Sequence, residues 1–280
     1  MKQYLDLARD VLENGVDKPN RTGIDTRAVF GRTMRFDMAD GFPIITTKKV
    51  PFKIVAGELL WLISGSSDVK ELQKLGVHIW DANAEADYWK PKAKFDGDLG
   101  RVYGVQWRSW QGADGTVVDQ LKDVIERIKK DPTDRRLIVT AWNPGELSQM
   151  ALPPCHMFFQ FFVAPSTSSG QAGKLSLSMY QRSCDMFLGV PFNISSYALL
   201  LHMVAQVTGL EAGEFFHILG DTHIYHNHFD QMKEQMSREP YGLPTLKLNP
   251  NIKDINAFTM DDIELVGYES HPTIKADMAV

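Results

Sequence analysis

Of the two cysteines in the sequence, one stands where a thiol could serve as a nucleophile. Cys155 follows Pro153 and Pro154 and comes directly before an apolar run. The prolines restrict the backbone ahead of the thiol, which suits a side chain presented at the entrance of a strand. A free cysteine is more often a small apolar core residue, so both interpretations stay open at this point. Neighbours on a strand point to opposite faces, which disfavours His156 as the base for the thiol and, with it, a papain-like hydrolase.

Four arginines lie in polar or turn-rich segments and could together hold a phosphate. Arg21 lies in the run NRTG, Arg135 and Arg136 end the run DPTDRR, and Arg182 precedes Ser183 in YQRSCD. Each arginine taken alone is best interpreted as a solvated surface side chain. Together they could bind a phosphate bidentately, with the Ser183 hydroxyl as a further donor. Positive charge beside the cysteine would also favour its thiolate.

The run GDTHIYHNH, residues 220–228, holds three histidines within six positions. Such spacing could bind a metal ion, but the cysteines are distant in the sequence and we expect no metal site. His223 and Tyr225 alternate with Ile224, so their polar tips would share one face of a strand. Two such groups suit hydrogen bonds to a sugar hydroxyl, which is the interpretation we favour.

Two polar residues stand in apolar surroundings. Glu58 is the charged residue in GELLWLI, and a buried carboxylate is unfavourable unless it is bonded or used. An exposed position near a helix N-terminus is an equal alternative for it. Asn193 enters a second apolar run, either as a helix cap or as an amide that pairs with one edge of a uracil. No P-loop pattern and no GxGxxG turn occurs, so the sequence does not support an ATP or dinucleotide site.

The elements that must position these residues mix helices with hairpin-linked strands. Hydrophobic periodicity predicts helices near residues 4–12 and 121–128 and a strand near 175–180. A long apolar run predicts a further helix near 194–208, and a β-rich run and a continuous apolar run predict strands near 137–142 and 157–164. The third helix is apolar nearly all round and so should be buried, and the apolar second strand should be covered on both faces. Residues 165–174 read as a hairpin loop between the last two strands. No repeat or Pro/Gly linker divides the chain, so we expect one α+β domain over residues 1–280.

Composition sets limits on the class of protein. The 280 residues are 44% hydrophobic and 23% charged, which excludes intrinsic disorder. A net charge of −5 gives no general attraction for polyanions, so nucleic-acid binding is disfavoured. Two cysteines are too few for a disulfide framework and fit a reducing compartment. The most apolar stretch, 197–207, is too short for a membrane span and the N-terminus is acidic, so we expect a cytoplasmic protein.

Four motifs together resemble those of one known family. PPCH at 153–156, YQRSCD at 180–185, PFN at 191–193 and GDTHIY at 220–225 are similar to the motifs of folate-dependent, cysteine-nucleophile thymidylate synthases. The resemblance runs from the first residues, MKQY, to the last, IKADMAV, and covers essentially the whole chain. It implies the thymidylate synthase-like fold, a mixed β-sheet packed by helices.

The resemblance also implies an activity, that of a methyltransferase in dTMP biosynthesis. Such an enzyme converts dUMP to dTMP, with 5,10-methylenetetrahydrofolate as the one-carbon and hydride donor, and releases dihydrofolate. Cys155 would attack carbon 6 of dUMP and make carbon 5 nucleophilic, while Glu58 and Tyr103 would organise water-linked proton transfers. The residues implied in catalysis are Cys155, Glu58, Tyr103, Arg182 and Asn193.

Each ligand is assigned a set of residues by the same resemblance. The implied dUMP-binding residues are Arg21, Arg135, Arg136, Arg182, Ser183, Cys184, Asp185, Asn193, His223 and Tyr225. The implied folate-binding residues are Trp80, Asp185, Leu188, Gly189, Phe192 and Ala279. Arg135 and Arg136 would arrive from a partner subunit, which implies a homodimer, and neither a metal nor a membrane is implied.

Two alternatives remain beside this interpretation. Departures from common family residues, at Pro51, Gly57, Asn83 and Asp277, lie mostly on the folate side. They leave room for a dUMP hydroxymethylase of the same superfamily, in which water rather than hydride completes the reaction. The other alternative is a non-catalytic nucleotide- or RNA-binding protein on the same scaffold. The presence of Cys155 and Glu58 argues against it, because binding alone needs no thiol.

Overall fold

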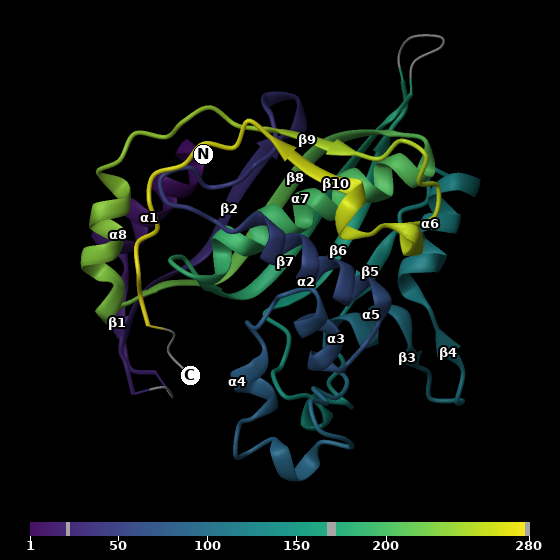
Figure 1. The fold of residues 1–280 in the computed structure, drawn as a ribbon, viewed down its shortest axis with the longest axis horizontal. Coiled ribbons are helices and arrows are strands. Elements are labelled where there is room, and N and C mark those ends of the chain that lie inside the picture. The colour runs from purple at the N-terminus through teal and green to yellow at the C-terminus, as the bar shows by residue number, and fades with distance from the viewer. Residues whose placement is uncertain (21–22, 167–171, 278–280) are drawn as a thin grey trace.

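The largest element is a mixed six-stranded sheet in the order β1-β2-β8-β7-β6-β5 (Figure 1). The structure, a computed structural model, describes residues 1–20, 23–166 and 172–277. The strands are β1 (Val16–Lys18), β2 (Thr26–Asp37), β5 (Ile138–Thr140), β6 (His156–Ala164), β7 (Lys174–Asp185) and β8 (Glu211–Tyr225). Only β7 and β8 pair in parallel, while the other neighbours within this sheet are antiparallel. Two short two-stranded sheets join β3 (Trp110–Gln111) to β4 (Val117–Val118) and β9 (Thr245–Leu248) to β10 (Ile263–Val266).

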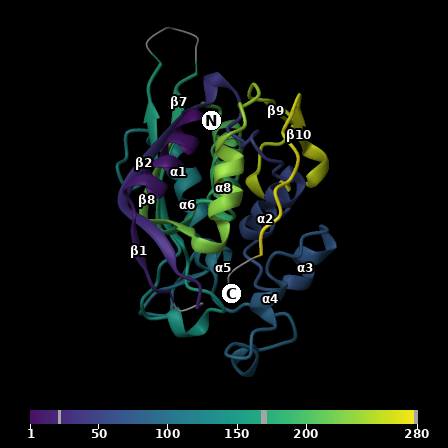
Figure 2. The same cartoon turned by 90° about the vertical axis from the view of Figure 1, so that its left-hand side faces the viewer.

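Helices cover one face of the large sheet (Figure 2). Among them are α1 (Lys2–Asn14), α6 (Gln120–Lys130) and α7 (Gly189–Thr208), which contact its strands. The other helices of the described residues are α2 (Phe52–Ser64), α3 (Val69–Lys74), α4 (Asp81–Ala84), α5 (Tyr103–Arg108) and α8 (Phe229–Met236), of which α3 and α4 lie away from the sheet (Figure 1). The combination of helices with a mixed sheet confirms the predicted α+β class, a mixed β-sheet packed by helices. The three helices and three strands expected from the sequence all occur, with ends shifted by up to five residues. Residues 167–171 of the predicted hairpin loop lie outside the described residues.

Helix α7 forms the centre of the core. Fourteen of its 20 residues are buried, and Gly209 ends it in the left-handed conformation that glycine adopts without a steric penalty. In the part of the chain that the structure describes, it is the one helix long and apolar enough to cross a membrane. Its apolar window is 78% buried within the protein, as in the core helix of a folded domain. A helix that is apolar on all sides, as the sequence of α7 is, is expected to be buried on all sides.

The other face of the sheet carries aromatic side chains that this chain leaves uncovered. Phe30 on β2 is 76% exposed, Phe162 on β6 is 66% exposed, and Phe216 on β8 is also exposed. The expectation that the 157–164 strand is covered on both faces is therefore wrong for the single chain. Phe159, Phe161 and Val163 face the core, while the alternate residues of the strand face outward. The run is continuously apolar because the outward positions include Phe158 and Phe162. A patch of this kind marks an interaction surface.

A close contact between α2 and α5 gives the first testable prediction. A Cβ on Gly104 would lie 2.3 Å from the carbonyl oxygen of Leu62, so Gly104→Ala must push the two helices apart. Overpacking typically costs about 1–3 kcal/mol, and the better helix propensity of alanine offsets about 1 kcal/mol. We expect a net loss of about 1 kcal/mol, and at most about 2 kcal/mol, in the free energy of unfolding, measured by urea denaturation at fixed protein concentration. Gly242→Ala, where a Cβ meets nothing within 4 Å, is the control and should be near neutral; equal effects in both variants would contradict this packing argument.

Candidate active site

A pocket of about 530 Å³ opens where β7 and β8 end and β6 begins. Its lining residues come from sequence positions as far apart as 18 and 225: Lys18, Pro19, Asn20, Thr26, Leu152, Cys155, Arg182, Ser183, Asp221, His223 and Tyr225. Five residues predicted from the sequence are brought together here, namely Cys155, Arg182, Ser183, His223 and Tyr225. Because the parallel pair β7 and β8 delivers its carboxyl ends to the same edge, residues 182–183 and 221–225 meet there.

Arg182 fixes the segment that carries the cysteine. Its Nε donates to the carbonyl oxygen of Pro154 at 2.8 Å, and Nη2 donates to that of Pro153 at 3.0 Å. Its backbone N–H donates to the carbonyl oxygen of Cys155 at 2.8 Å. These bonds use two of the five guanidinium donors and leave three for a ligand in the pocket. The fixed positive charge lies beside the half-buried Cys155, an arrangement that favours a thiolate.

Tyr103 holds the cysteine from the other side. The backbone N–H of Cys155 donates to the Tyr103 hydroxyl oxygen at 2.7 Å. Burial raises the pKa of Tyr103 well above its usual value, with smaller contributions from the nearby Cys155 and Glu58 charges. The phenol therefore stays protonated, and its O–H remains a donor behind Cys155, although Tyr103 itself is buried and does not line the pocket.

Glu58 lies on α2 behind Tyr103. Trp80 Nε1 donates to Glu58 Oε1 at 2.7 Å, and the Trp80 ring packs edge-on against Tyr103 with centroids 5.7 Å apart. Burial raises the pKa of Glu58 to about 6, although the Trp80 bond opposes the shift. A carboxyl group with this pKa changes protonation close to neutral pH, as a proton-transfer group requires.

The neighbour of the cysteine turns away from the pocket. His156 stacks on Tyr103 with ring centroids 4.1 Å apart, and its Nδ1 lies 2.7 Å from the Tyr197 hydroxyl. Burial lowers the pKa of His156 to about 3, so the ring is neutral. The second cysteine, Cys184, is fully buried and donates from Sγ to the Gln181 carbonyl oxygen at 3.2 Å. Burial raises the pKa of the Cys184 thiol, so the thiol stays protonated, and the assignment of Cys184 to the dUMP set stays a prediction.

His223 and Tyr225 line the far wall of the pocket with their rings edge to face. Asp221 Oδ1 accepts a hydrogen bond from His223 Nδ1 at 3.0 Å, which leaves Nε2 for a ligand. Asp221 also pairs with Lys18 Nζ at 2.5 Å, and Asn20 Nδ2 donates to the Tyr225 hydroxyl at 3.4 Å. Sequence reasoning missed Lys18, Asn20 and Asp221. Asp221 lies within the quoted GDTHIY motif, and its position two residues before His223 was the available signal.

Asn193 lies in the first turns of α7 with its amide orientation fixed. Its Oδ1 accepts from Gln181 Nε2 at 3.0 Å, and the same nitrogen donates to the Ser183 carbonyl oxygen at 3.0 Å. Gln181 Oε1 in turn accepts from His217 Nε2 at 2.9 Å. This chain of bonds leaves Asn193 Nδ2 to donate to a ligand. Gln181 and His217 were not predicted, because nothing in a strand sequence shows which polar side chains will meet a helix.

The predicted folate-side residues gather at the start of α7. Asp185 Oδ1 accepts from the backbone N–H groups of Phe187 at 3.0 Å and Leu188 at 3.3 Å. Leu188 and Phe192 are half-buried apolar side chains, whereas Trp80, the other aromatic residue of the folate set, is buried where it donates to Glu58. Lys48, which sequence reasoning missed, donates to the Phe187 carbonyl oxygen and lies over its ring, and burial lowers the pKa of this lysine to about 8.

The C-terminal segment is tied to the body close to its last described residue. His228 Nε2 donates to the carbonyl oxygen of Asp277 at 2.8 Å, and Arg238 Nη1 donates to that of Pro272 at 2.7 Å. Ala279, assigned to the folate site, lies outside the described residues, as does Arg21 of the dUMP set. Their placement therefore stays a prediction.

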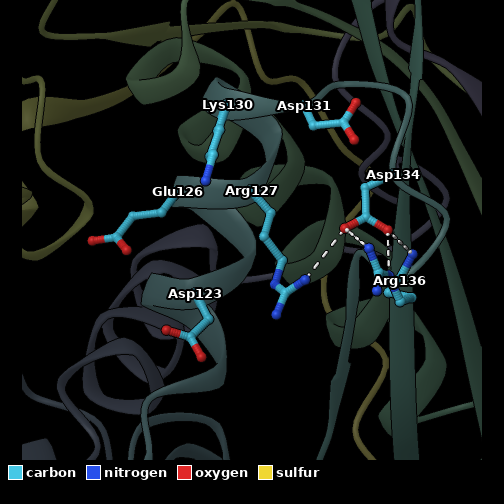
Figure 3. A pocket seen from close by; sticks show the side chains of 7 residues that line it. All are labelled: Asp123, Glu126, Arg127, Lys130, Asp131, Asp134 and Arg136. Carbon is cyan, nitrogen blue, oxygen red and sulfur yellow. Dashed lines mark hydrogen bonds and ion pairs between the residues drawn. The ribbon is translucent and has the colours of Figure 1, made fainter.

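Arg135 and Arg136 do not line the cysteine pocket of their own chain. They lie just before β5, where Arg136 lines a separate cavity with residues of α6 (Figure 3). Asp134 binds Arg136 there, with Nε to Oδ1 at 2.9 Å. The exposed position of both arginines leaves them able to contact another molecule.

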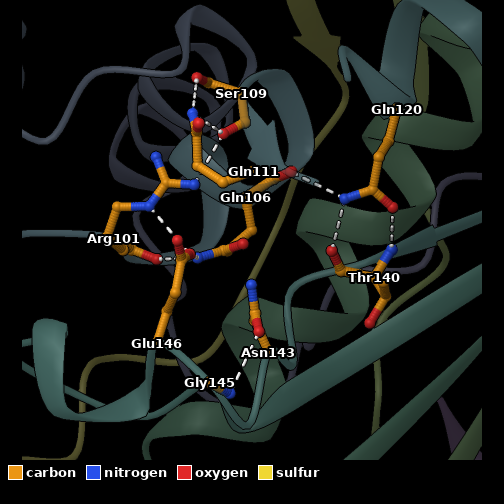
Figure 4. A network of polar contacts seen from close by, with 9 residues as sticks. All are labelled: Arg101, Gln106, Ser109, Gln111, Gln120, Thr140, Asn143, Gly145 and Glu146. Atoms are coloured by element: carbon orange, nitrogen blue, oxygen red, sulfur yellow. Dashed lines mark hydrogen bonds and ion pairs between the residues drawn. The ribbon is translucent and has the colours of Figure 1, made fainter. Parts of the chain in front are cut away.

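A polar network fixes α5, and with it Tyr103, against α6 and β5 (Figure 4). Glu146 Oε2 accepts from Arg101 Nε at 2.9 Å and from Gln106 Nε2 at 2.6 Å. Gln120 donates to the carbonyl oxygens of Gln106 and Thr140 at 2.7 and 2.8 Å, and its Oε1 accepts from Thr140 N–H at 3.0 Å. The Arg101 and Glu146 side chains are at most 15% exposed, so this ion pair is well shielded from solvent.

The amino-acid sequence matches one known protein family over nearly its whole length. A sequence profile of the family described as thymidylate synthase matches residues 2–280. The match includes both walls of the pocket and the tail segment after β10. Among the residues that the structure describes, no group of three or more His, Cys, Asp or Glu could hold a metal ion.

The buried carboxylate predicts a dependence of stability on pH. Glu58 has an ordinary pKa of 4.5 and a folded-state pKa of about 6, so the folded state holds the proton more tightly than the unfolded state. The stability that protonation provides is therefore complete below pH 4.5 and is lost as the pH rises through 6. We expect Glu58→Gln to match the wild type near pH 4.5 and to exceed it by at most about 2 kcal/mol at pH 8.

Urea denaturation at pH 5 and pH 8 measures this difference. The control is Glu13→Gln, which removes an exposed carboxylate on α1 and should give the same shift at both pH values. A Glu58→Gln effect that does not change with pH would show that the carboxylate is not held in an unfavourable environment.

Proposed function

The chain belongs to the thymidylate synthase family, and from that premise we propose that it methylates dUMP reductively to dTMP. The family consists of methyltransferases that bind dUMP and a reduced folate. The observation that carries the proposal is the placement of Cys155, in a pocket lined by a guanidinium group, a hydroxyl-rich wall and a histidine. We further propose that residues 1–280 form one catalytic domain and that the enzyme works in the cytoplasm.

Nucleophilic attack is the part of the reaction that the cysteine performs. The Cys155 thiolate adds to carbon 6 of the uracil ring, and the electron pair displaced from the ring double bond makes carbon 5 nucleophilic. Arg182 supports this step by keeping positive charge beside the thiol, while Tyr103 holds the backbone of the same residue. Asn193 Nδ2, left free by the Gln181 bond, donates to the carbonyl oxygen on which negative charge develops.

Proton transfer falls to Glu58. Its pKa of about 6 allows the carboxyl group both to give and to accept a proton near neutral pH, through water that reaches carbon 5 and its neighbouring carbonyl. The Trp80 bond orients the carboxylate, and the protonated Tyr103 hydroxyl offers a second donor in line with it. The deoxyribose hydroxyl is bound by His223 and Tyr225, whose polar tips face the same side of the pocket.

The folate would lie at the α7 end of the site. Leu188, Phe192 and Trp80 offer apolar surface for its ring, and Asp185 keeps one carboxylate oxygen beyond the two backbone bonds to accept from a ring N–H. Bound there, 5,10-methylenetetrahydrofolate supplies the one-carbon unit and the hydride, and dihydrofolate is the second product. Ala279 completes this set as the family resemblance implies.

The phosphate requires more positive charge than one chain brings to its own pocket. Arg182 and Ser183 are in place, and Arg21 adjoins Asn20, which lines the pocket. We propose that Arg135 and Arg136 complete the phosphate site of the partner subunit in a homodimer. The aromatic face formed by Phe30, Phe162 and Phe216 is the surface on which two subunits would pair.

The experiment that tests the function is a turnover assay with dUMP and 5,10-methylenetetrahydrofolate. We expect dTMP by mass spectrometry, with an equal amount of dihydrofolate by absorbance. A hydroxymethylated nucleotide without dihydrofolate would instead identify a dUMP hydroxymethylase. Bound dUMP without any product would favour a non-catalytic nucleotide- or RNA-binding protein.

The two cysteines make a matched pair of variants. Cys155→Ser should lower turnover to background while dUMP binding stays measurable, because the hydroxyl is a far weaker nucleophile than a thiolate. Cys184→Ser removes the other thiol but keeps a donor for the Gln181 carbonyl, so most of the activity should remain. Turnover by Cys155→Ser, with Cys184→Ser inactive, would reverse the assignment.

Dimerisation through the sheet face is tested at Phe162. Phe162→Glu places a charge in the aromatic face and should give a monomer by sedimentation, with turnover reduced at least tenfold because the partner arginines are missing. Phe95→Glu, at a residue that is 47% exposed away from the sheet, is the control and should stay dimeric and active. A monomeric Phe162→Glu variant with full activity would remove Arg135 and Arg136 from the site.

A further inference from the structure

The exposed Arg136 is held in one orientation, although it does not line the cysteine pocket of its own chain. Its side chain is 80% exposed, a setting in which a long arginine is normally free to change rotamer. Asp134 instead binds it at three points: the backbone N–H at 2.8 Å, Nε at 2.9 Å and Nη2 at 3.3 Å (Figure 3). The carboxylate of Asp134 is itself only 6% exposed.

Arg127 ties this arrangement to the core of the molecule. Its Nη1 donates to Asp134 Oδ2 at 3.3 Å from helix α6, the inner face of which is buried through Leu121, Val124, Ile125 and Ile128. The two arginines hold the pKa of Asp134 at about 2, so the carboxylate stays charged throughout the working pH range. The direction of the Arg136 guanidinium is thereby fixed relative to α6 and β5.

The cavity around Arg136 is unsuited to an anion of its own. It is lined by four carboxylates, on Asp123, Glu126, Asp131 and Asp134, and by three cations, on Arg127, Lys130 and Arg136. A phosphate bound there would meet net negative charge. Arg135 differs from Arg136, since its side chain is exposed and no bond of the described residues orients it. The Asp134 contacts therefore orient Arg136 and not Arg135. Because the cavity of its own chain does not suit an anion, the binding partner of this oriented guanidinium must lie outside its own chain.

We propose that Asp134, braced by Arg127, is a positioning residue that pre-orients Arg136 for the dUMP phosphate in the partner subunit. This inference rests on the proposed function. It explains why Arg136, which one subunit would donate to the other, is already oriented before the phosphate binds. A pre-oriented side chain loses less conformational entropy on binding than a free one does. The bond to Asp134 also leaves guanidinium N–H groups of Arg136 unused and available to the phosphate.

The variant Asp134→Asn tests the proposal, because two explanations predict opposite signs. Removing a carboxylate near a phosphate site should lower KM for dUMP if only the charge matters. Releasing Arg136 should raise KM about three- to tenfold, the effect of ordering one long side chain on binding, and should leave kcat within twofold. The control is Asp131→Asn, which removes the same charge from the same cavity but bonds only Thr133. It should leave KM unchanged or lower it.

A double-mutant cycle with Arg136→Ala shows whether Asp134 acts through the arginine. In the Arg136→Ala background, Asp134→Asn should have no further effect on KM. An unchanged or lower KM for Asp134→Asn, or an effect that persists without Arg136, would overturn the proposal.

Two further measurements keep the outcome unambiguous. Sedimentation and thermal unfolding show whether Asp134→Asn still folds and dimerises, and if it does not, Arg127→Gln takes its place in the same cycle. A rise in KM for Arg127→Gln that vanishes with Arg136→Ala supports the proposal, and any other result overturns it. A wild-type protein without turnover would refute the proposed function, whereas normal wild-type turnover with an unchanged variant refutes only this inference.

Discussion

The geometry of the candidate active site depends on one set of contacts, the bonds from Arg182 to the segment that carries Cys155. The side chain of this arginine donates to the carbonyl oxygens of Pro153 and Pro154, and its backbone donates to that of Cys155. The carbonyl oxygens of the two prolines are thereby satisfied as acceptors just ahead of the thiol. One residue thus fixes the position of the thiol, supplies positive charge beside it and keeps further donors for a ligand.

The rest of the fold supplies rigid attachment for those contacts. The parallel pair β7 and β8 places Arg182, Ser183 and His223 at one edge of the sheet, and α7 enters the core beside them. On the opposite side, the network from Glu146 through Gln106 and Gln120 to Thr140 fixes α5. Catalytic groups on strands and helices that are bonded in this way need little reorganisation during the reaction. The raised pKa of Glu58 indicates a position that disfavours the charged carboxylate, which an uncharged side chain would suit better.

Local patterns in the sequence predicted the elements, while contacts between distant segments decided much of the site. The long apolar run at 194–208 and the period of the 121–128 run were sufficient to predict α7 and α6, and alternation was sufficient for β7. The order of the strands was not predictable, because pairing between residues 26–37 and 211–225 leaves no local signal. Lys18 and Gln181 were missed for the same reason, as each acquires its role from a partner far along the chain. The prediction that β6 is covered on both faces within one chain was wrong, because an apolar run has the same sequence pattern whether a helix or a second subunit covers it.

The central claim is that Cys155, and not Cys184, forms a covalent bond with the nucleotide. The most direct measurement is to mix the protein with dUMP and 5,10-methylenetetrahydrofolate, stop the reaction with denaturant during turnover, digest the protein and locate the added mass among the cysteine peptides. This account predicts a nucleotide adduct on the peptide that contains Cys155 and none on the peptide that contains the buried Cys184. An adduct on Cys184, or turnover without an adduct on either peptide, would contradict it.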